Sequence, residues 1–254
     1  MAQQATPGRT ARLGRTVGPR PAAVSGAVLL LPGGQEVSAR RPSALRAAAS
    51  LGTLGRRLAR AGRAEGLATH VVHYRYRGWN GSQAHPAQDA AWAVEEAVRR
   101  YGDVPVCLAG LGMGGRAALH AGGHEAVNSV VAIAPWLPED DVAASPEPVK
   151  QLVGRQVLIV HGTNDQRTDP ELSFRFAARA KKANRDVCRF EVHTDGHGLR
   201  QYRDEVTSLA VDFVMGALFG HDFSRPVRDA LAAPPPLGLR MPLAAGFGRS
   251  LRRR

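Results

Sequence analysis

The feature that most constrains the fold of this chain is an alternation of short apolar runs with longer amphipathic stretches along its 254 residues. Runs of five or six apolar residues predict buried strands, and apolar residues three or four positions apart predict helices between them. This order predicts an α/β fold, with a mostly parallel sheet of six or more strands and helices on both faces. We expect strands at residues 27–31, 69–74, 104–109, 129–133, 156–160 and 187–192, and helices at residues 43–64, 86–101, 114–122, 170–183 and 198–218.

Gly and Pro residues punctuate the ends of most expected strands. Ligand sites in open parallel sheets lie along the carboxyl edge, so these loops fall where a site is expected. Residues 138–154 are acidic and contain prolines, which predicts at most a short lid and therefore little or no cap. The strand-end loops are PGG (32–34), RGWNG (77–81), APWLP (134–138) and HGTND (161–165).

A sharp turn of small residues joins the strand VCLAG (106–110) to the helix that begins in GLGMGGRAAL (110–119). It has the shape of a nucleophile elbow, G-x-S-x-G, in which a strained central residue points its oxygen at the substrate. Gly110 and Gly114 fit this pattern, but the central position is Gly112, so the nucleophilic oxygen is absent.

The same glycines could pass for a dinucleotide-binding loop, but two features argue against that interpretation. The turn follows the third or fourth strand instead of the first, and no acidic residue ends a following strand as a ribose binder would. We therefore expect no cofactor.

Together with three further segments, the turn resembles the α/β-hydrolase superfamily, especially compact bacterial esterases and dienelactone-hydrolase-like proteins. The resemblance covers about residues 26–219 and implies the α/β-hydrolase fold. The segments follow the family's order of nucleophile, acid and histidine. They are VLLLPGG (28–34), the turn at 110–114, VLIVHGTND (157–165) and TDGHG (194–198).

The resemblance implies a role for each motif position. Gly112 takes the nucleophile position, Asp165 is the acid that orients the histidine, and His197 is the general base. The backbone amides of Met113 and Gly34 are the expected oxyanion donors. Gln35 is the alternative for the second donor and also an expected pocket residue.

Asp165 and its neighbour His161 also have structural interpretations. Asp165 could cap the helix near Pro170, although Asp169 can cap it equally well. His161 belongs to the turn signature, and we expect a structural role for it.

Further pocket residues are expected from the loops at the same edge. Trp79, with Arg75 and Arg77, leaves the second strand, where a guanidinium group could bind a substrate carboxylate. A solvated loop with a stacked Trp explains these residues equally well. Trp136 and Leu137 are expected either as a pocket wall or as core residues.

The net charge of +12 is concentrated in the two ends of the chain. Residues 26–221 hold 23 Lys and Arg against 20 Asp and Glu, so nucleic acid is an unlikely partner of this domain. We expect one α/β-hydrolase domain at 26–221, a disordered basic tail at 1–25, and a disordered tail rich in Pro, Gly and Arg at 222–254.

No window approaches the 18 apolar residues of a membrane span, and the run at 27–31 is too short for a signal-peptide core. We expect a cytoplasmic protein that does not bind a membrane. Cys107 and Cys188 sit in expected strands, which predicts buried free thiols, with neither a disulfide nor a metal site.

Three functions fit these observations. The first is a protein derived from a serine ester hydrolase whose activity is lost or strongly reduced. The second is a pseudoenzyme that binds a small molecule without cleaving it. The third is an enzyme in which Asp165 and His197 act as a base on water or on a substrate proton. Ser50, in AASLG (48–52), cannot replace the missing serine because it lies midway along an expected helix.

Overall fold

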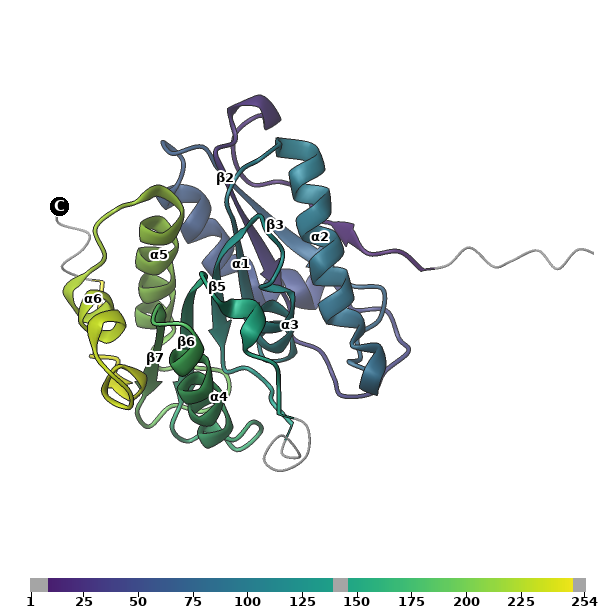
Figure 1. Ribbon diagram of the computed structural model, residues 1–254. Helices are drawn as coiled ribbons and strands as arrows, with labels where there is room; N and C mark the ends of the chain where they lie inside the picture. The colour runs from purple at the N-terminus through teal and green to yellow at the C-terminus, as the bar shows by residue number, and fades with distance from the viewer. Residues whose placement is uncertain (1–8, 139–145, 249–254) are drawn as a thin grey trace, which may run out of the picture.

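The computed structural model describes residues 9–138 and 146–248, which form a sheet between two layers of helices (Figure 1). The strands lie in the order β1-β3-β2-β4-β5-β6-β7-β8. β1 pairs antiparallel with β3, and the other neighbouring strands are parallel. The strands are β1 (Arg12–Leu13), β2 (Gly26–Leu31), β3 (Leu67–His73), β4 (Val106–Leu111), β5 (Val127–Ile133), β6 (Gln156–Gly162), β7 (Val187–Val192) and β8 (Met241–Pro242).

The helices divide between the two faces of the sheet. Successive residues of a strand point to opposite faces, and the side chains of β2 accordingly alternate between two hydrophobic clusters. Residues of α2, α3 and α4 cover one face, and residues of α1, α5 and α6 cover the other. The helices are α1 (Ala44–Ala61), α2 (His85–Tyr101), α3 (Met113–Ala121), α4 (Pro170–Ala183), α5 (Arg203–Phe219) and α6 (Arg225–Ala232), with short 3₁₀ turns η1 (Pro21–Ala23), η2 (Gly81–Gln83), η4 (Lys150–Leu152) and η5 (Leu237–Leu239).

All six expected strands and all five expected helices are present, most with ends moved by one to three residues. Cys107 and Cys188 lie buried in β4 and β7. The largest change is in α5, which begins at Arg203 and not at Gly198. The carboxylate of Asp195 accepts hydrogen bonds from the amides of residues 200, 201 and 202, so this segment forms a loop before the helix.

The expectation of a disordered amino-terminal tail does not hold for residues 9–25. The β1 segment pairs with β3, and the Gly14 amide donates to Val71 O at 2.8 Å. Val17 and Thr69 exchange two backbone hydrogen bonds of 2.9 and 3.0 Å. These bonds cover the edge of β3, which would otherwise expose unpaired backbone groups. Residues 1–8 lie outside the described residues.

The carboxyl-terminal segment also packs on the domain, so the expectation of disorder fails for residues 222–248. Val227 of α6 is fully buried, and β8 extends the sheet beside β7. The buried Lys181 ammonium donates to Ala230 O and Leu231 O at 3.1 Å, and Arg189 donates to Leu239 O at 2.9 Å. The domain therefore extends past both expected boundaries. Residues 249–254 lie outside the described residues.

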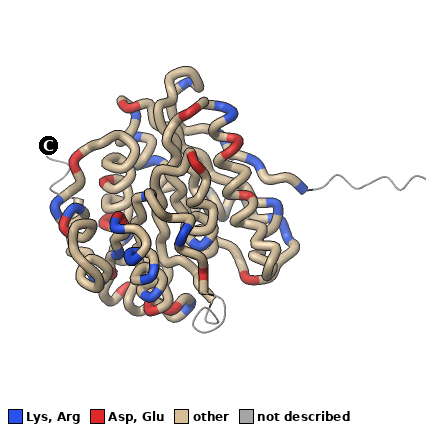
Figure 2. Tube along the Cα trace, in the orientation of Figure 1, with Lys and Arg blue, Asp and Glu red and all other residues tan. Residues whose placement is uncertain are grey.

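Charged residues of both signs are interspersed along the described chain (Figure 2). None of the described helices is long and apolar enough to cross a membrane. Whether the protein binds nucleic acid stays a prediction from the charge distribution.

Candidate active site

The turn between β4 and α3 holds Gly112 in a backbone conformation with φ 56° and ψ −117°. Side chains other than hydrogen are strained at such positive φ values. A Cβ atom on Gly110 would collide with the carbonyl of Gly114, and one on Gly114 would collide with the carbonyl of Leu31. The Gly112 amide donates to Ile133 O at 2.9 Å, so the turn is fixed against β5. The small residues therefore hold position 112 at the carboxyl edge of the sheet.

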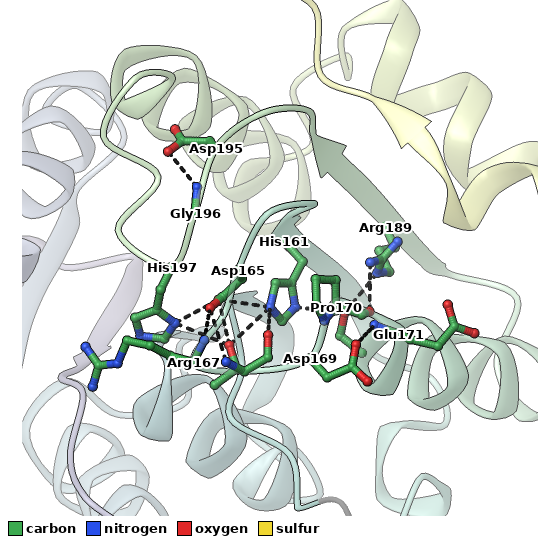
Figure 3. Close-up of polar contacts among 12 residues, drawn as sticks. His161, Asp165, Arg167, Asp169, Pro170, Glu171, Arg189, Asp195, Gly196 and His197 are labelled. Atoms are coloured by element: carbon green, nitrogen blue, oxygen red, sulfur yellow. Dashed lines mark hydrogen bonds and ion pairs between the residues drawn. The ribbon is translucent and has the colours of Figure 1, made fainter.

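Two further loops bring Asp165 and His197 to the same place. Asp165 follows β6 and His197 follows β7, and His197 Nδ1 donates to Asp165 Oδ2 at 2.8 Å (Figure 3). A Cβ atom at position 112 would lie 3.6 Å from His197 Nε2. The three positions expected from the sequence therefore converge, although 32 residues separate the acid from the histidine.

Asp165 is fully buried and accepts hydrogen bonds from several directions. Thr168 donates its hydroxyl at 2.7 Å and its amide at 3.1 Å, and the Arg167 amide donates at 2.8 Å. Burial alone would raise the pKa of Asp165, but hydrogen bonds from His161, His197 and Thr168 hold that pKa well below its ordinary value. The residue is therefore a carboxylate at neutral pH.

His161 lies on the opposite side of Asp165 from His197 (Figure 3). Its Nε2 donates to Asp165 Oδ2 at 3.2 Å, and its Nδ1 lies 2.9 Å from Ser173 Oγ. Burial lowers the pKa of His161, which favours the neutral ring. His161 therefore holds the Asp165 carboxylate in place on the side away from His197, which is a structural role. Asp169 caps α4 by accepting from the Glu171 amide at 2.8 Å, so Asp165 is not the cap.

The loop that carries His197 is shaped by Asp195, a residue that sequence reasoning missed. Asp195 is buried, and its carboxylate also accepts from the Gly196 amide at 2.9 Å. Together with its bonds to the start of α5, this contact bends the chain on both sides of His197. The TDGHG segment contains the signal, because an Asp before a glycine favours side-chain to backbone hydrogen bonds in turns.

The two expected oxyanion donors lie beside each other. Met113 is in the first turn of α3, where N–H groups have no partner within the helix. A Cβ atom on Gly34 would lie 3.0 Å from Met113 Cγ, and both residues line the same cavity. The Gln35 amide donates to Arg77 O at 3.0 Å instead. The structure therefore contradicts Gln35 as the alternative donor, because its only N–H on the backbone is already used.

A cavity of about 540 Å³ opens at this edge of the sheet. Its lining includes the expected residues Gly34, Gln35, Gly112, Met113, Trp136 and His197. Arg167, Thr168, Glu36 and Ser43 also line it and were not expected as site residues. Ser50 of α1 lies on the wall, where its hydroxyl donates to Ala47 O at 3.0 Å, so it does not take the nucleophile position.

The expectation that Trp79 and Leu137 are pocket residues is wrong. Both are buried in the core, and neither lines the cavity. The Arg116 guanidinium explains the position of Trp79. It lies 3.9 Å from the centre of the Trp79 ring and 4.7 Å from the centre of the Trp136 ring. Trp79 therefore serves as a stacking partner for a buried cation, while Trp136 contributes both to that stack and to the cavity wall.

Arg75 and Arg77 differ in their surroundings. Arg75 Nε lies 2.5 Å from the buried Asp89 carboxylate, so this guanidinium is held away from ligands. Arg77 lines the cavity. Only the second of the two remains a candidate for binding a ligand carboxylate.

Comparison with protein families gives one match. Residues 132–218, about a third of the chain, match the model of the prolyl oligopeptidase family. The matched segment contains Asp165 and His197 but not Gly112. No curated protein matches the chain.

Solved structures with similar folds include esterases and other α/β hydrolases. An esterase of Pyrococcus furiosus is 13% identical, with a TM-score of 0.58 over 77% of this chain and 84% of that one. The butyrate-bound form of an esterase from Thermogutta terrifontis is 18% identical, with a TM-score of 0.58 over 84% and 91%. An alpha-beta serine hydrolase homologue from Coxiella burnetii is 17% identical, with a TM-score of 0.52 over 79% and 89%. The chain therefore has the α/β-hydrolase fold.

Proposed function

We propose that this protein is a hydrolase-derived scaffold whose ester-hydrolase activity is lost or strongly reduced, and whose cavity serves to bind a small molecule without covalent chemistry. One observation carries the proposal: the position 3.6 Å from His197 Nε2, where the Cβ of a nucleophilic side chain would stand, belongs to a glycine. The acid, the histidine and the expected oxyanion donors surround that position, so the covalent step is what is missing.

The size of the expected loss follows from the chemistry of such triads. Without the nucleophile, an oxyanion hole and substrate binding alone leave a rate about 10³ to 10⁴ above that in water. That rate is far below the acceleration of a working esterase. Retention of a binding role accounts for an open cavity with both polar and apolar lining residues, and the butyrate-bound neighbour of the same fold favours a small-molecule ligand.

The proposal is tested by restoring the hydroxyl with Gly112→Ser and measuring turnover of p-nitrophenyl acetate and p-nitrophenyl butyrate. Apart from the adjoining residues 111 and 113, a Cβ atom at position 112 meets only the imidazole within 4 Å among the described residues, so the Cβ of a serine displaces no neighbour. We expect the wild type to stay at or below the residual rate of a site without a nucleophile and Gly112→Ser to exceed the wild type by about 10² or more, because nucleophile and base are then in reach of each other.

The double variant Gly112→Ser with His197→Ala is the matched control and should return to the wild-type level. Wild-type turnover at the level of a working esterase would overturn the proposal. A Gly112→Ser variant that folds but gains no ester turnover would contradict the catalytic geometry on which the proposal rests.

A second candidate function is base chemistry by His197 and Asp165 without a covalent intermediate. The observation that favours it is the intact Asp165–His197 hydrogen bond of 2.8 Å, facing open space at position 112. In that case the wild type itself would turn over a substrate, and His197→Ala would abolish the turnover while Gly112→Ser would reduce it.

A further inference from the structure

The space next to Gly112 indicates which ligand chemistry the cavity accepts. We infer that it binds the carboxylate of a small organic acid, with one carboxylate oxygen at the place where a nucleophilic hydroxyl would stand; this assignment rests on the proposed function.

The geometry around position 112 suits a carboxylate. Among the described residues other than 111 and 113, only His197 Nε2, at 3.6 Å, and His197 Cε1, at 3.7 Å, lie within 4 Å of a Cβ placed there. A ligand carboxylate oxygen in this space is within hydrogen-bond reach of the imidazole, and it accepts from Nε2 when both ring nitrogens carry a proton, because Nδ1 already donates to Asp165. Met113 and Gly34 line the adjacent wall, where their amides can receive the second oxygen. The ligand carboxylate then has one oxygen at the imidazole and the other at the two amides, as the carboxylate product of an ester hydrolysis would.

The charges that line the cavity favour an anion. Arg77 and Arg167 line it, and neither guanidinium has an ion-pair partner among the described residues. Figure 3 shows the Arg167 side chain extending past the His197 ring. Glu36 is the one acidic residue among the described residues of the lining, and the Asp165 carboxylate lies behind the imidazole, against Nδ1. The amino terminus of α3 adds partial positive charge.

The rest of the lining suits an organic body. Pro32, Pro42, Leu111, Met113 and Trp136 present apolar side chains to the cavity. A volume of about 540 Å³ is typical of small-molecule sites. An inorganic anion would leave this apolar surface without a partner, so the ligand combines a carboxylate with a short apolar body.

Butyrate is a direct probe, with butyramide as its uncharged isostere and inorganic phosphate as the anion without an apolar body. NMR chemical shifts of the full chain, followed during titration with each compound, give the three Kd values. We expect butyrate to bind at least about tenfold more tightly than either of the others, because charge-assisted hydrogen bonds distinguish it from the amide. Equal binding of butyrate and butyramide, or tighter binding of phosphate, would overturn the assignment.

Three variants locate the site. Gly112→Ala places a methyl group where the ligand oxygen is expected and should weaken butyrate binding at least about tenfold, and Arg167→Gln should weaken it severalfold. Arg60→Gln, which removes the same charge from an exposed position of α1 outside this cavity, should leave the Kd unchanged. Unchanged butyrate binding by Gly112→Ala would show that the carboxylate lies elsewhere.

Gly112→Ser serves as a second blocking variant if Gly112→Ala does not fold, because its own ester turnover reports on its folding. The two proposals fail differently. Absence of butyrate binding together with a gain of esterase activity in Gly112→Ser overturns the carboxylate assignment alone, whereas esterase activity of the wild type overturns the proposed function.

Discussion

Gly112 has a backbone conformation that a serine would occupy only under strain. With φ at 56° and ψ at −117°, a residue that bears a Cβ atom is expected to raise the free energy of the folded state by about 1–3 kcal/mol. The surrounding structure would have to hold the residue in that conformation. Glycine carries neither that cost nor a nucleophilic oxygen. Under the proposed function, exchange of a serine for glycine in such a turn would relieve strain while removing the covalent step, which makes a more stable but silent site physically accessible.

A pair of glycine substitutions tests this account of the backbone. Gly112→Ala should lower the free energy of unfolding by about 1–3 kcal/mol, because the methyl group meets a positive φ. Gly52, within α1, is the matched control: a Cβ there meets nothing within 4 Å, so Gly52→Ala should raise the free energy of unfolding by roughly 0.5–1 kcal/mol. Urea unfolding of the three proteins measures both changes. A Gly112→Ala protein as stable as the wild type would contradict the strain.

At the scale of secondary-structure elements, a buried ion pair ties α3 to the chain that precedes η4. Arg116 Nε donates to Glu147 Oε2 at 3.1 Å, and Glu147 also accepts a hydrogen bond from His120. Since Arg116 is stacked between two tryptophans, the pair fixes α3, the helix that begins at the expected oxyanion donor Met113.

The acid dependence of stability reports on this ion pair. Burial alone would raise the pKa of Glu147, but hydrogen bonds from His120 and Arg116 lower that pKa to about 2. A carboxylate with a lowered pKa stabilises the folded state above its ordinary pKa of about 4.5, and the stabilisation is lost as the pH falls from there towards about 2. The contribution at neutral pH is on the order of 3 kcal/mol.

Glu147→Gln should therefore lower the free energy of unfolding at pH 7 by about 3 kcal/mol and flatten its decline between pH 4.5 and 2. Denaturant unfolding at a series of pH values measures both effects. Glu125→Gln, at an exposed position without an ion pair among the described residues, is the matched control. If the free energy of unfolding of Glu147→Gln declined in acid as steeply as that of the wild type, the Arg116–Glu147 ion pair would not be the cause of the acid dependence.

For the whole molecule, the sequence predicted the core of the fold because its signals are local. The central strands are buried on both faces and read as continuous apolar runs, and α4 has a proline and a capping Asp at its start. The terminal segments could not be predicted in this way. β1 and β8 have two residues each, and they are ordered by strand partners far along the chain, Val72 for β1 and Phe190 for β8, which no local pattern reveals.

The candidate site, like the fold, could be predicted from the sequence only in part. Motif order placed Gly112, Asp165 and His197, because strand adjacency brings the loops of a parallel sheet together. The walls of the cavity depend on which side chains turn inward. Trp79 was expected there but stacks on a buried guanidinium, and Arg167 was missed because nothing in its sequence neighbourhood distinguishes it from a solvated residue.

Covalent labelling of Gly112→Ser with a fluorophosphonate tests the geometry of the site most directly. An activated serine attacks the phosphorus and expels fluoride, so peptide mass spectrometry should show one phosphonyl adduct at position 112. We expect that adduct in Gly112→Ser, none in the wild type, and a large loss of labelling when His197→Ala is added. A folded Gly112→Ser protein that remains unlabelled, or that labels equally well without His197, would contradict the claim that position 112 faces a base oriented by Asp165.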